Sequence, residues 1–409
     1  MKNILFITRR FCLPVVLIGL LLEMGSCKKS APAAPVITSV RNYVSHPGDS
    51  LIGQAGPGQW IVISGNNLKG ALQINFDGVA SSFNEALFSD TSAVVLIPAV
   101  IAFPIVPANK LNTITYITTH GQTTFTLKIF PPAPSITRIS NENALPGDSV
   151  TVYGLNLFFI QSVTFAGASI TTFNEAVDGT FISFPMPSTT HAGPVTITTT
   201  VGTAITPFTV NDVETGVLSN FDDLFNYAYF SANITNDPAL FPGAHGNYAE
   251  LNATNIGASD YAWYNGGRGI NLNPVQWIPA ANINDPIANY VIKFEMYTKT
   301  PWSNGTIYLA QNFDFTYIAR YEPWLNADGS STPFMTKGWQ TITIPASAFK
   351  TKPSTSGAFD GTGVSITTFK DLLGAGGNQP FSLWIINNSS TPIPAFDAAF
   401  DNLRIEKIK

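Results

Sequence analysis

Three short segments in the C-terminal half of the chain place aromatic rings beside amides, Arg or Gly. They are 260–268 (DYAWYNGGR), 300–305 (TPWSNG) and 317–326 (YIARYEPWLN). A flat ring removes an apolar ligand face from water and meets its C–H groups with a negative π cloud. Amide and guanidinium groups can hydrogen-bond hydroxyls around the rim of the same ligand. These segments therefore predict a site for a ligand with one C–H face and a polar rim, which is the chemistry of a pyranose ring.

Each of these rings has an alternative interpretation as part of a hydrophobic core. Trp339 and Trp384 lie within apolar strand patterns, and we interpret both as core residues. Trp302 and Trp324 follow Pro in turns, where an indole is harder to bury, and we predict that they contact the ligand. The complete set of predicted ligand contacts is Trp302, Trp324, Tyr321, Trp263, Tyr264 and Trp277.

Catalytic chemistry has little support in the sequence. Glycoside hydrolysis needs two suitably spaced carboxylates, and no recognised catalytic motif surrounds any candidate. His245 is the single His after residue 215, which leaves little for acid–base or metal chemistry. We predict no catalytic residue and no enzyme, with a jelly-roll glycoside hydrolase or lyase as the alternative. The candidate carboxylates for that alternative are Glu250, Asp260, Glu295, Asp314 and Glu322.

The composition indicates a weakly charged β protein. The 409 residues carry a formal net charge of −5, and only 11% of them are charged. No basic stripe is present, which excludes nucleic acid as the main partner. Turn-forming Gly, Pro and Asn alternate with Val, Ile, Thr and Phe, so we expect an all-β fold.

The first 26 residues predict an export signal. Positive residues precede a short apolar run at 15–22, and Met24-Gly-Ser-Cys27 follows it. This end resembles a bacterial lipobox, although Met24 departs from the usual Leu. The resemblance implies that 1–26 is a lipoprotein signal peptide, that Cys27 is lipidated and that 27–34 is a tether. The alternative is ordinary secretion with Cys27 as a free thiol.

The segment 35–212 contains one pattern twice. A Pro-x-Ile opening, a Pro-Gly-Asp-Ser turn, a strand ending in Gly-x-Asn-Leu and a φ-x-Phe-x-Gly block recur in the same order. The first copy carries two insertions, at 51–60 and 101–111. The pattern resembles the IPT/TIG immunoglobulin-like fold, which implies two sandwich domains at 35–131 and 132–212. Neither copy shows site chemistry, so we interpret both as spacers, with Trp60 either capping its sandwich or touching a ligand.

The segment 215–409 holds six of the seven Trp residues and is long enough to be one domain. Residues 290–297 alternate strictly, with Lys293 and Glu295 on one face and Phe294 on the other. Strands are also expected at 221–224, 338–345, 381–387 and 399–405, with a helical turn at 366–373. The opening FDDL, the strand GWQTITIP and the closing FDNLRI resemble β-jelly-roll carbohydrate-binding modules. Such modules often hold a structural Ca²⁺, which would fall here on Asp222, Asp223 and Asp401, although these can equally be plain surface carboxylates.

The whole layout resembles surface glycan-binding proteins of Bacteroidetes polysaccharide-utilisation loci, including xyloglucan binders. The resemblance implies a lipid-anchored outer-membrane protein that faces the cell exterior and captures a neutral β-glycan for uptake. It also implies a TonB-dependent transporter complex as a partner. The alternative function is a protein-binding adhesin or stalk, which the crowding of aromatic residues in one domain disfavours.

Overall fold

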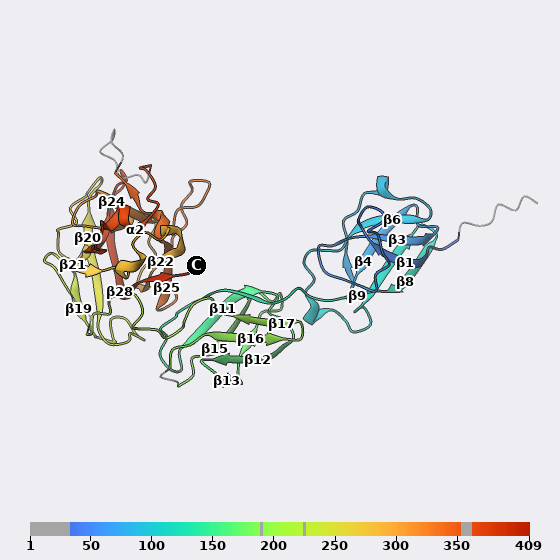
Figure 1. The fold of residues 1–409 in the computed structure, drawn as a ribbon, viewed down its shortest axis with the longest axis horizontal. Coiled ribbons are helices and arrows are strands. Elements are labelled where there is room, and N and C mark those ends of the chain that lie inside the picture. Colours follow the sequence, from blue (N-terminus) through green and yellow to red (C-terminus); the bar gives the residue numbers. More distant parts are fainter. Residues whose placement is uncertain (1–32, 189–190, 224–225, 353–361) are drawn as a thin grey trace, which may run out of the picture. The chain divides into compact units, whose positions relative to one another are not determined.

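The structure is a computed structural model that describes residues 33–188, 191–223, 226–352 and 362–409. Its contacts divide the chain into two compact units, Met1–Pro132 and Ala133–Lys409, and the described part of each unit is built almost wholly from β-strands (Figure 1). The prediction of an all-β fold is confirmed.

The first unit is an immunoglobulin-like sandwich of two antiparallel sheets. One sheet has the order β1-β3-β6 and the other the order β5-β4-β7-β8, and β2 pairs with β9 in parallel. Ile61, Ile63, Phe76 and Val95 point between the sheets and are fully buried. The strands are β1 (Val36–Asn42), β2 (Gln54–Ala55), β3 (Trp60–Asn66), β4 (Ala71–Phe76), β5 (Val79–Ala80), β6 (Ser92–Leu96), β7 (Thr113–Thr118), β8 (Gly121–Thr126) and β9 (Lys128–Ile129).

The second immunoglobulin-like repeat opens the second unit and has the same architecture. Its sheets have the orders β10-β11-β15-β14 and β13-β12-β16-β17, around a core that includes Val152, Phe165 and Ile197. The strands are β10 (Ser135–Ile139), β11 (Ser149–Leu155), β12 (Ile160–Phe165), β13 (Ala168–Ile170), β14 (Asn174–Glu175), β15 (Phe181–Pro185), β16 (Val195–Thr199) and β17 (Gly202–Ile205).

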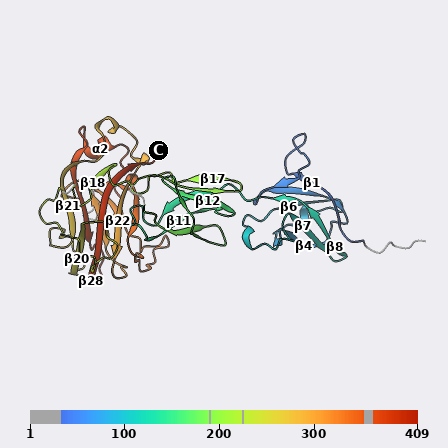
Figure 2. The same ribbon diagram turned by 90° about the horizontal axis from the view of Figure 1, so that it is seen from below.

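The C-terminal sandwich packs two larger sheets face to face, and Figure 2 shows β20, β28 and β22 running side by side. The first sheet has the order β19-β20-β28-β22-β25 with β18 also on β28, and the second has the order β21-β27-β23-β24-β26. The strands are β18 (Val217–Ser219), β19 (Asn233–Thr235), β20 (Tyr248–Ile256), β21 (Gly269–Gln276), β22 (Tyr290–Thr298), β23 (Thr306–Ala310), β24 (Tyr317–Tyr321), β25 (Gln340–Pro345), β26 (Lys350–Thr351), β27 (Asn378–Ile386) and β28 (Ile393–Lys407).

Two local predictions for this domain have different outcomes. The helical turn is confirmed as α2 (Phe369–Leu373), which Thr368 and Asp371 close with a reciprocal capping box. The strand expected at 221–224 is wrong over its described residues, because the first strand is β18 and Phe221 has a positive φ of 59°. The Phe221 ring nevertheless enters the core, so the apolar signal was real and only its backbone conformation differs.

Several charged residues are buried at the junction between the second repeat and the first sheet of the sandwich. Glu142 of the repeat accepts hydrogen bonds from Lys293 at 2.8 Å and from Arg404 at 2.8 Å. Arg404 also donates to Glu295 at 2.9 Å and to Glu406 at 3.0 Å. These five residues are called the junction cluster below. Four of them come from β22 and β28, so the repeat and the sandwich form one compact unit.

Candidate glycan-binding face

The structure buries two of the predicted ligand contacts. Trp302 is only 4% exposed, and its indole N–H donates to the carbonyl of Asn304 at 2.6 Å. Trp277 is 1% exposed and donates to the carbonyl of Gln379 at 3.0 Å. The prediction that these rings are exposed is therefore wrong. A carbonyl within reach satisfies each indole N–H, and the ring can then join the core even beside a turn.

Trp324 and Tyr321 are partly buried against the same core and do not form an open surface. Trp324 donates to the carbonyl of Gly305 at 2.8 Å. Tyr321 points from β24 toward the sandwich interior, where its ring lies 6.3 Å from Trp302. Burial raises the pKa of the Tyr321 hydroxyl. Tyr321 thus lies beside Trp302 as expected, but against the core. Trp263 packs in a separate cluster, so the predicted exposed platform around Trp302 is wrong.

The outer face of the second sheet has a different and more suitable geometry. Strand register places Trp384, Tyr308 and Arg320 opposite one another on β27, β23 and β24. Trp384 and Tyr308 are fully buried on this face, beneath loop residues, in a cluster separate from the main core. Trp384 was predicted to be buried, and the structure confirms it.

The Trp384 ring is held flat against β21. A Cβ on Gly269 would lie 2.4 Å from Cδ1 of Trp384, so only glycine leaves room for the indole. The indole N–H of Trp384 donates to the side chain of Asn271 at 2.7 Å. The Trp384 ring is therefore held in one position, on which other rings can stack.

Trp263 is partly exposed, stacks on Trp384 and links it to a group of more exposed rings. Its ring lies 5.0 Å from Trp384 at an interplanar angle of 16°, and 6.4 Å from Phe313 at 23°. Tyr264 lies 5.8 Å from Trp263 and is 53% exposed. Two further rings complete the group, since Phe230 is 52% and Tyr229 is 72% exposed. We call the set Tyr229, Phe230, Trp263, Tyr264 and Phe313 the aromatic platform.

A salt bridge fixes the loop that carries Trp263 and Tyr264. Arg268 donates to Asp260 at 2.7 Å, and Asp260 also accepts the backbone N–H of Ala262 at 3.0 Å. Burial would raise the pKa of Asp260, but these hydrogen bonds and the Arg268 charge lower it overall. The carboxylate therefore stays ionised and holds the loop in place, which reduces the entropy cost of ligand binding.

Polar side chains continue the same sheet face beyond the rings. Thr306 donates to Glu322 and Arg320 donates to Glu322 at 2.6 Å. Asn388 lies at the end of this network, with its amide 3.4 Å from the hydroxyl of Tyr308. The face thus joins flat apolar rings to hydroxyl, amide and guanidinium groups, which is the combination that the sequence predicted for a sugar.

Sequence reasoning found two members of the platform and missed three. It identified Trp263 and Tyr264, but not Tyr229, Phe230 or Phe313. The adjacent pair Tyr229-Phe230 in a segment without strand alternation was the available signal for two of these. The Phe230 ring lies 6.2 Å from Trp263. This contact joins segments that are distant in sequence, so a local pattern does not reveal it.

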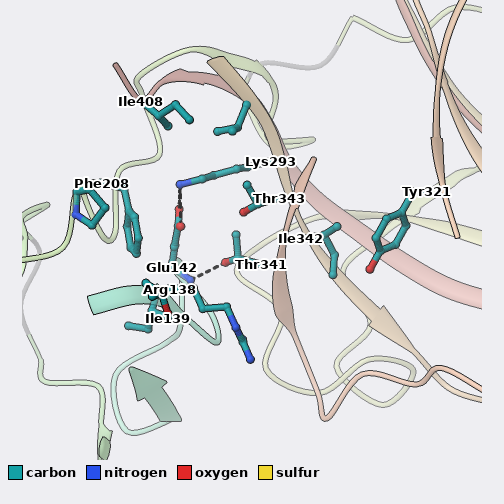
Figure 3. A pocket seen from close by; sticks show the side chains of 13 residues that line it. Arg138, Ile139, Glu142, Phe208, Lys293, Tyr321, Thr341, Ile342, Thr343 and Ile408 are labelled. Atoms are coloured by element: carbon teal, nitrogen blue, oxygen red, sulfur yellow. Dashed lines mark hydrogen bonds and ion pairs between the residues drawn. The ribbon is translucent and has the colours of Figure 1, made fainter. Parts of the chain in front are cut away.

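A large cavity lies elsewhere and lacks an aromatic platform. It measures about 520 Å³ and lies between the second repeat and the first sheet of the sandwich. Figure 3 shows Glu142 and Lys293 pointing toward each other across it. Its one phenylalanine ring, Phe208, has the Lys293 ammonium 4.5 Å from the ring centroid. Because that cation occupies the ring face, this cavity is a poor place to stack a sugar.

The Ca²⁺ expected on Asp222, Asp223 and Asp401 stays a prediction. Among the described residues, no three His, Cys, Asp or Glu side chains gather as a metal-ligand group. Asp222 accepts the backbone N–H of Asn247 at 2.7 Å, and Asp401 accepts that of Asn402 at 2.7 Å. Burial, followed by the charges of Glu295 and Asp222, raises the pKa of Asp401 well above its usual value.

Cys27 and the predicted signal peptide lie outside the described residues. Within the described part of the chain, no helix is long and apolar enough to cross a bilayer.

Residues 210–407 match the family described as the surface glycan-binding protein B xyloglucan binding domain. An IPT/TIG domain-containing protein of Bacteroides ovatus is 29% identical over 174 residues, which are 42% of this chain. That match spans 35% of the relative, so this chain corresponds to about a third of its length. The predicted resemblances to these two families are confirmed.

Two solved structures share the fold over most of the chain. The surface glycan-binding protein PbSGBP-B from Prevotella bryantii has a TM-score of 0.65 at 19% identity, over 92% of this chain and 99% of its own. An SGBP-B from a complex xyloglucan utilization locus in Bacteroides uniformis has a TM-score of 0.53 at 18% identity, over 91% and 99%. At these identities the likeness establishes the fold.

Proposed function

We propose that this chain, whose C-terminal domain matches the surface glycan-binding protein B xyloglucan binding domain, captures a neutral β-glycan at the cell surface for uptake. The single observation that carries the proposal is the aromatic platform. Five rings from three separate segments converge over one sheet face, and three of them are more than half exposed.

The arrangement suits an uncharged, extended ligand. The rings offer several faces in contact with one another, so more than one sugar can stack on them. The polar groups nearest the platform are already paired, Arg268 with Asp260 and Arg320 with Glu322. Because these charges are neutralised in pairs, neither Arg268 nor Arg320 is free to select an acidic sugar, and a neutral glycan fits the platform best.

Binding without catalysis is part of the proposal. A general acid in glycoside hydrolysis needs a raised pKa, whereas the pKa of Asp260 is lowered. Glu295 lies in the junction cluster, on the sheet opposite to the platform. Glu250 and Glu322 pair with Lys299 and Arg320. These carboxylates serve structural contacts, which supports a binding protein.

The proposed location is the outer surface of the outer membrane, with lipidated Cys27 as the anchor and a TonB-dependent transporter complex as the receiving partner. The support is the lipobox-like Met24-Gly-Ser-Cys27 and the family of the C-terminal domain. A tether of a few residues between Cys27 and β1 would hold the first repeat close to the membrane.

Affinity electrophoresis and calorimetry with xyloglucan and mixed-linkage glucan test the proposal. Tyr264→Ala and Tyr229→Ala should each weaken binding roughly tenfold, since stacking contributes on the order of 1 kcal/mol beyond area burial. Both rings are largely exposed, so the melting temperature should stay unchanged. The matched control is Phe181→Ala, an exposed ring of the second repeat. Normal binding by both platform variants, or no binding of any neutral glycan by the parent, would contradict the proposal.

A further inference from the structure

The first repeat carries an exposed aromatic pair on its outer surface. Tyr43 directly follows β1, and its ring lies 6.1 Å from Trp60 at the start of β3. Tyr43 is 55% and Trp60 is 44% exposed. Trp60 was expected either to cap the sandwich or to touch a ligand, and an indole this exposed does little capping.

Strand register shows that Trp60 belongs to an apolar band on the outer face of its sheet, formed with Val62, Val94 and Leu96. Trp60 lies opposite Leu96 and Val62 lies opposite Val94, on the face of the β1-β3-β6 sheet that points away from the core. The alternate residues of β3, Ile61 and Ile63, are fully buried on the core face. The fold therefore builds its core from one face of the sheet and leaves the apolar band on the other.

The second repeat shows that the fold does not need this band. Strand β11 of the second repeat corresponds to β3 of the first, and Ser149 takes the position of Trp60. The pairing of β11 with β15 has the same register as the pairing of β3 with β6. Ser149 lies opposite Pro185, and Thr151 lies opposite Ser183. The same architecture thus replaces Trp, Leu and both Val residues with smaller or polar ones, which separates the band from folding.

The insertion at 51–60 fixes the backbone beside Trp60. Ile97 donates its N–H to the carbonyl of Gln59 at 2.9 Å, and Gly58 donates to the carbonyl of Ile97 at 3.1 Å. The Gln59 side chain accepts the N–H of Gly56 at 3.2 Å, which leaves its amide hydrogens available. The indole is therefore presented from a paired and ordered strand.

Charged groups lie beside the rings. Arg41 faces the same side as Val62 and forms a salt bridge with Asp49, whose other oxygen lies 3.2 Å from Nδ1 of His46. An apolar protein partner would have to desolvate this pair at a cost. A sugar can instead hydrogen-bond to it, because hydroxyls both donate and accept.

We propose that Tyr43 and Trp60 form a second saccharide-binding site, on the first repeat, for the same class of neutral polysaccharide. This inference rests on the proposed function, in which the ligand is a polymer with many equivalent sugar units. Two weak contacts on one polymer chain raise the overall affinity without any new contact between them. A short oligosaccharide that occupies a single site gains nothing from the second one.

The test uses the full chain in soluble form, with Cys27→Ala, and measures affinity for polymeric xyloglucan and for a short xyloglucan oligosaccharide. Trp60→Ala should weaken apparent binding of the polymer severalfold to about tenfold and leave oligosaccharide affinity unchanged. The double variant Tyr229→Ala/Tyr264→Ala should still be slowed slightly by the polymer in affinity electrophoresis. That remaining retardation should disappear when Trp60→Ala is added. Melting should be unaltered in each case, because Trp60 lies outside the core.

The second repeat supplies a matched control. Phe181 and Tyr153 form a comparable pair with centroids 6.3 Å apart, but the Arg138 guanidinium lies 3.5 Å from the Tyr153 ring and takes its face. Phe181→Ala should therefore bind the polymer like the parent chain.

Three outcomes would overturn the inference. The second site does not exist if Trp60→Ala and its parent are retarded equally by the polymer in both backgrounds. The face is a protein interface if Trp60→Ala changes the sedimentation of the chain but not its retardation. If the parent chain binds neither polymer nor oligosaccharide, the proposed function fails and this inference fails with it.

Discussion

Replacing Arg404 by Met should destabilise the second unit strongly. Arg404 is almost fully buried at the centre of the junction cluster, where it donates to Glu142, Glu295 and Glu406. Burial alone would lower its pKa, but Glu295 and Glu142 outweigh that effect and raise it. Without Arg404, Glu142 and Glu406 would share Lys293. The buried Glu295 would keep only its neutral donors, Asn143 and Thr341.

The expected magnitude follows from the burial of the cluster. Removing one member of a buried, hydrogen-bonded ion pair costs about 3–5 kcal/mol, because its partners stay desolvated and unpaired. For a unit of this size, each kcal/mol corresponds to roughly 2–4 °C, so the melting temperature should fall by on the order of 10 °C. Glu142→Gln should cost less, since Lys293 keeps Glu406 and Arg404 keeps two carboxylates.

Differential scanning calorimetry of the full chain measures this effect, with glycan affinity as a second readout. The affinity of the folded variant should stay unchanged, because the cluster and the aromatic platform lie on opposite sheets. Lys407→Met is the control, since Lys407 lies on the same strand but is half exposed in its salt bridge with Asp285. The reasoning fails if Arg404→Met melts as the Lys407 control does, or if it loses glycan affinity without losing stability.

The same cluster changes the role expected for the second repeat. The sequence suggested two spacers, yet Glu142 of this repeat covers Lys293 and Arg404 of the sandwich. Deleting the repeat would remove this carboxylate and expose both cations to water. We therefore expect a sandwich expressed without residues 133–212 to melt below the intact unit.

Three further variants test other parts of the account. Cys27→Ala should release the protein from the membrane fraction, and retention at the parent level would argue against the anchor. Trp302→Ala should cost about 3–5 kcal/mol of stability, as expected for a core ring, whereas Tyr264→Ala should melt like the parent; the reverse order in thermal melting would show that core and site have been exchanged. Asp401→Asn should raise the melting temperature at pH 7. The folded-state pKa of Asp401 is raised above its unfolded value of 3.8, so its contribution to stability is fully present below pH 3.8 and is lost as the pH rises through the folded pKa. An Asn side chain stays neutral and avoids that loss. The difference in melting temperature from the parent should vanish near pH 3.8. A variant that melts below the parent at pH 7 would contradict this prediction.

The sequence was sufficient wherever local pattern decides structure. The alternation at 290–297 put Ile292, Phe294 and Met296 on one face of a strand, and in the structure that face lies in the core. The recurring turn and strand blocks at 35–212 predicted two sandwiches of one type, whose sheets have matching register. Apolar flanks were also enough to identify Trp339 and Trp384 as buried.

The sequence could not decide which aromatic turns face outward. Trp302 and Trp263 both lie in Gly- and Asn-containing segments, yet one ring enters the core and the other stacks on a sheet face. The difference depends on a carbonyl that accepts the Trp302 N–H and on Trp384 beneath Trp263. Trp384 lies far from Trp263 in sequence, so no local pattern contains the contact that distinguishes the two.

The burial of charge was equally invisible in the chain order. The alternation put Lys293 and Glu295 on one face of a strand, which would ordinarily be the solvent face. The structure covers that face with the second repeat, and Glu142, Arg404 and Glu406 satisfy the charges there. Sequence period fixes which side chains share a face, because it reflects local backbone geometry. What covers the face depends on long-range packing, and only the tertiary structure shows it.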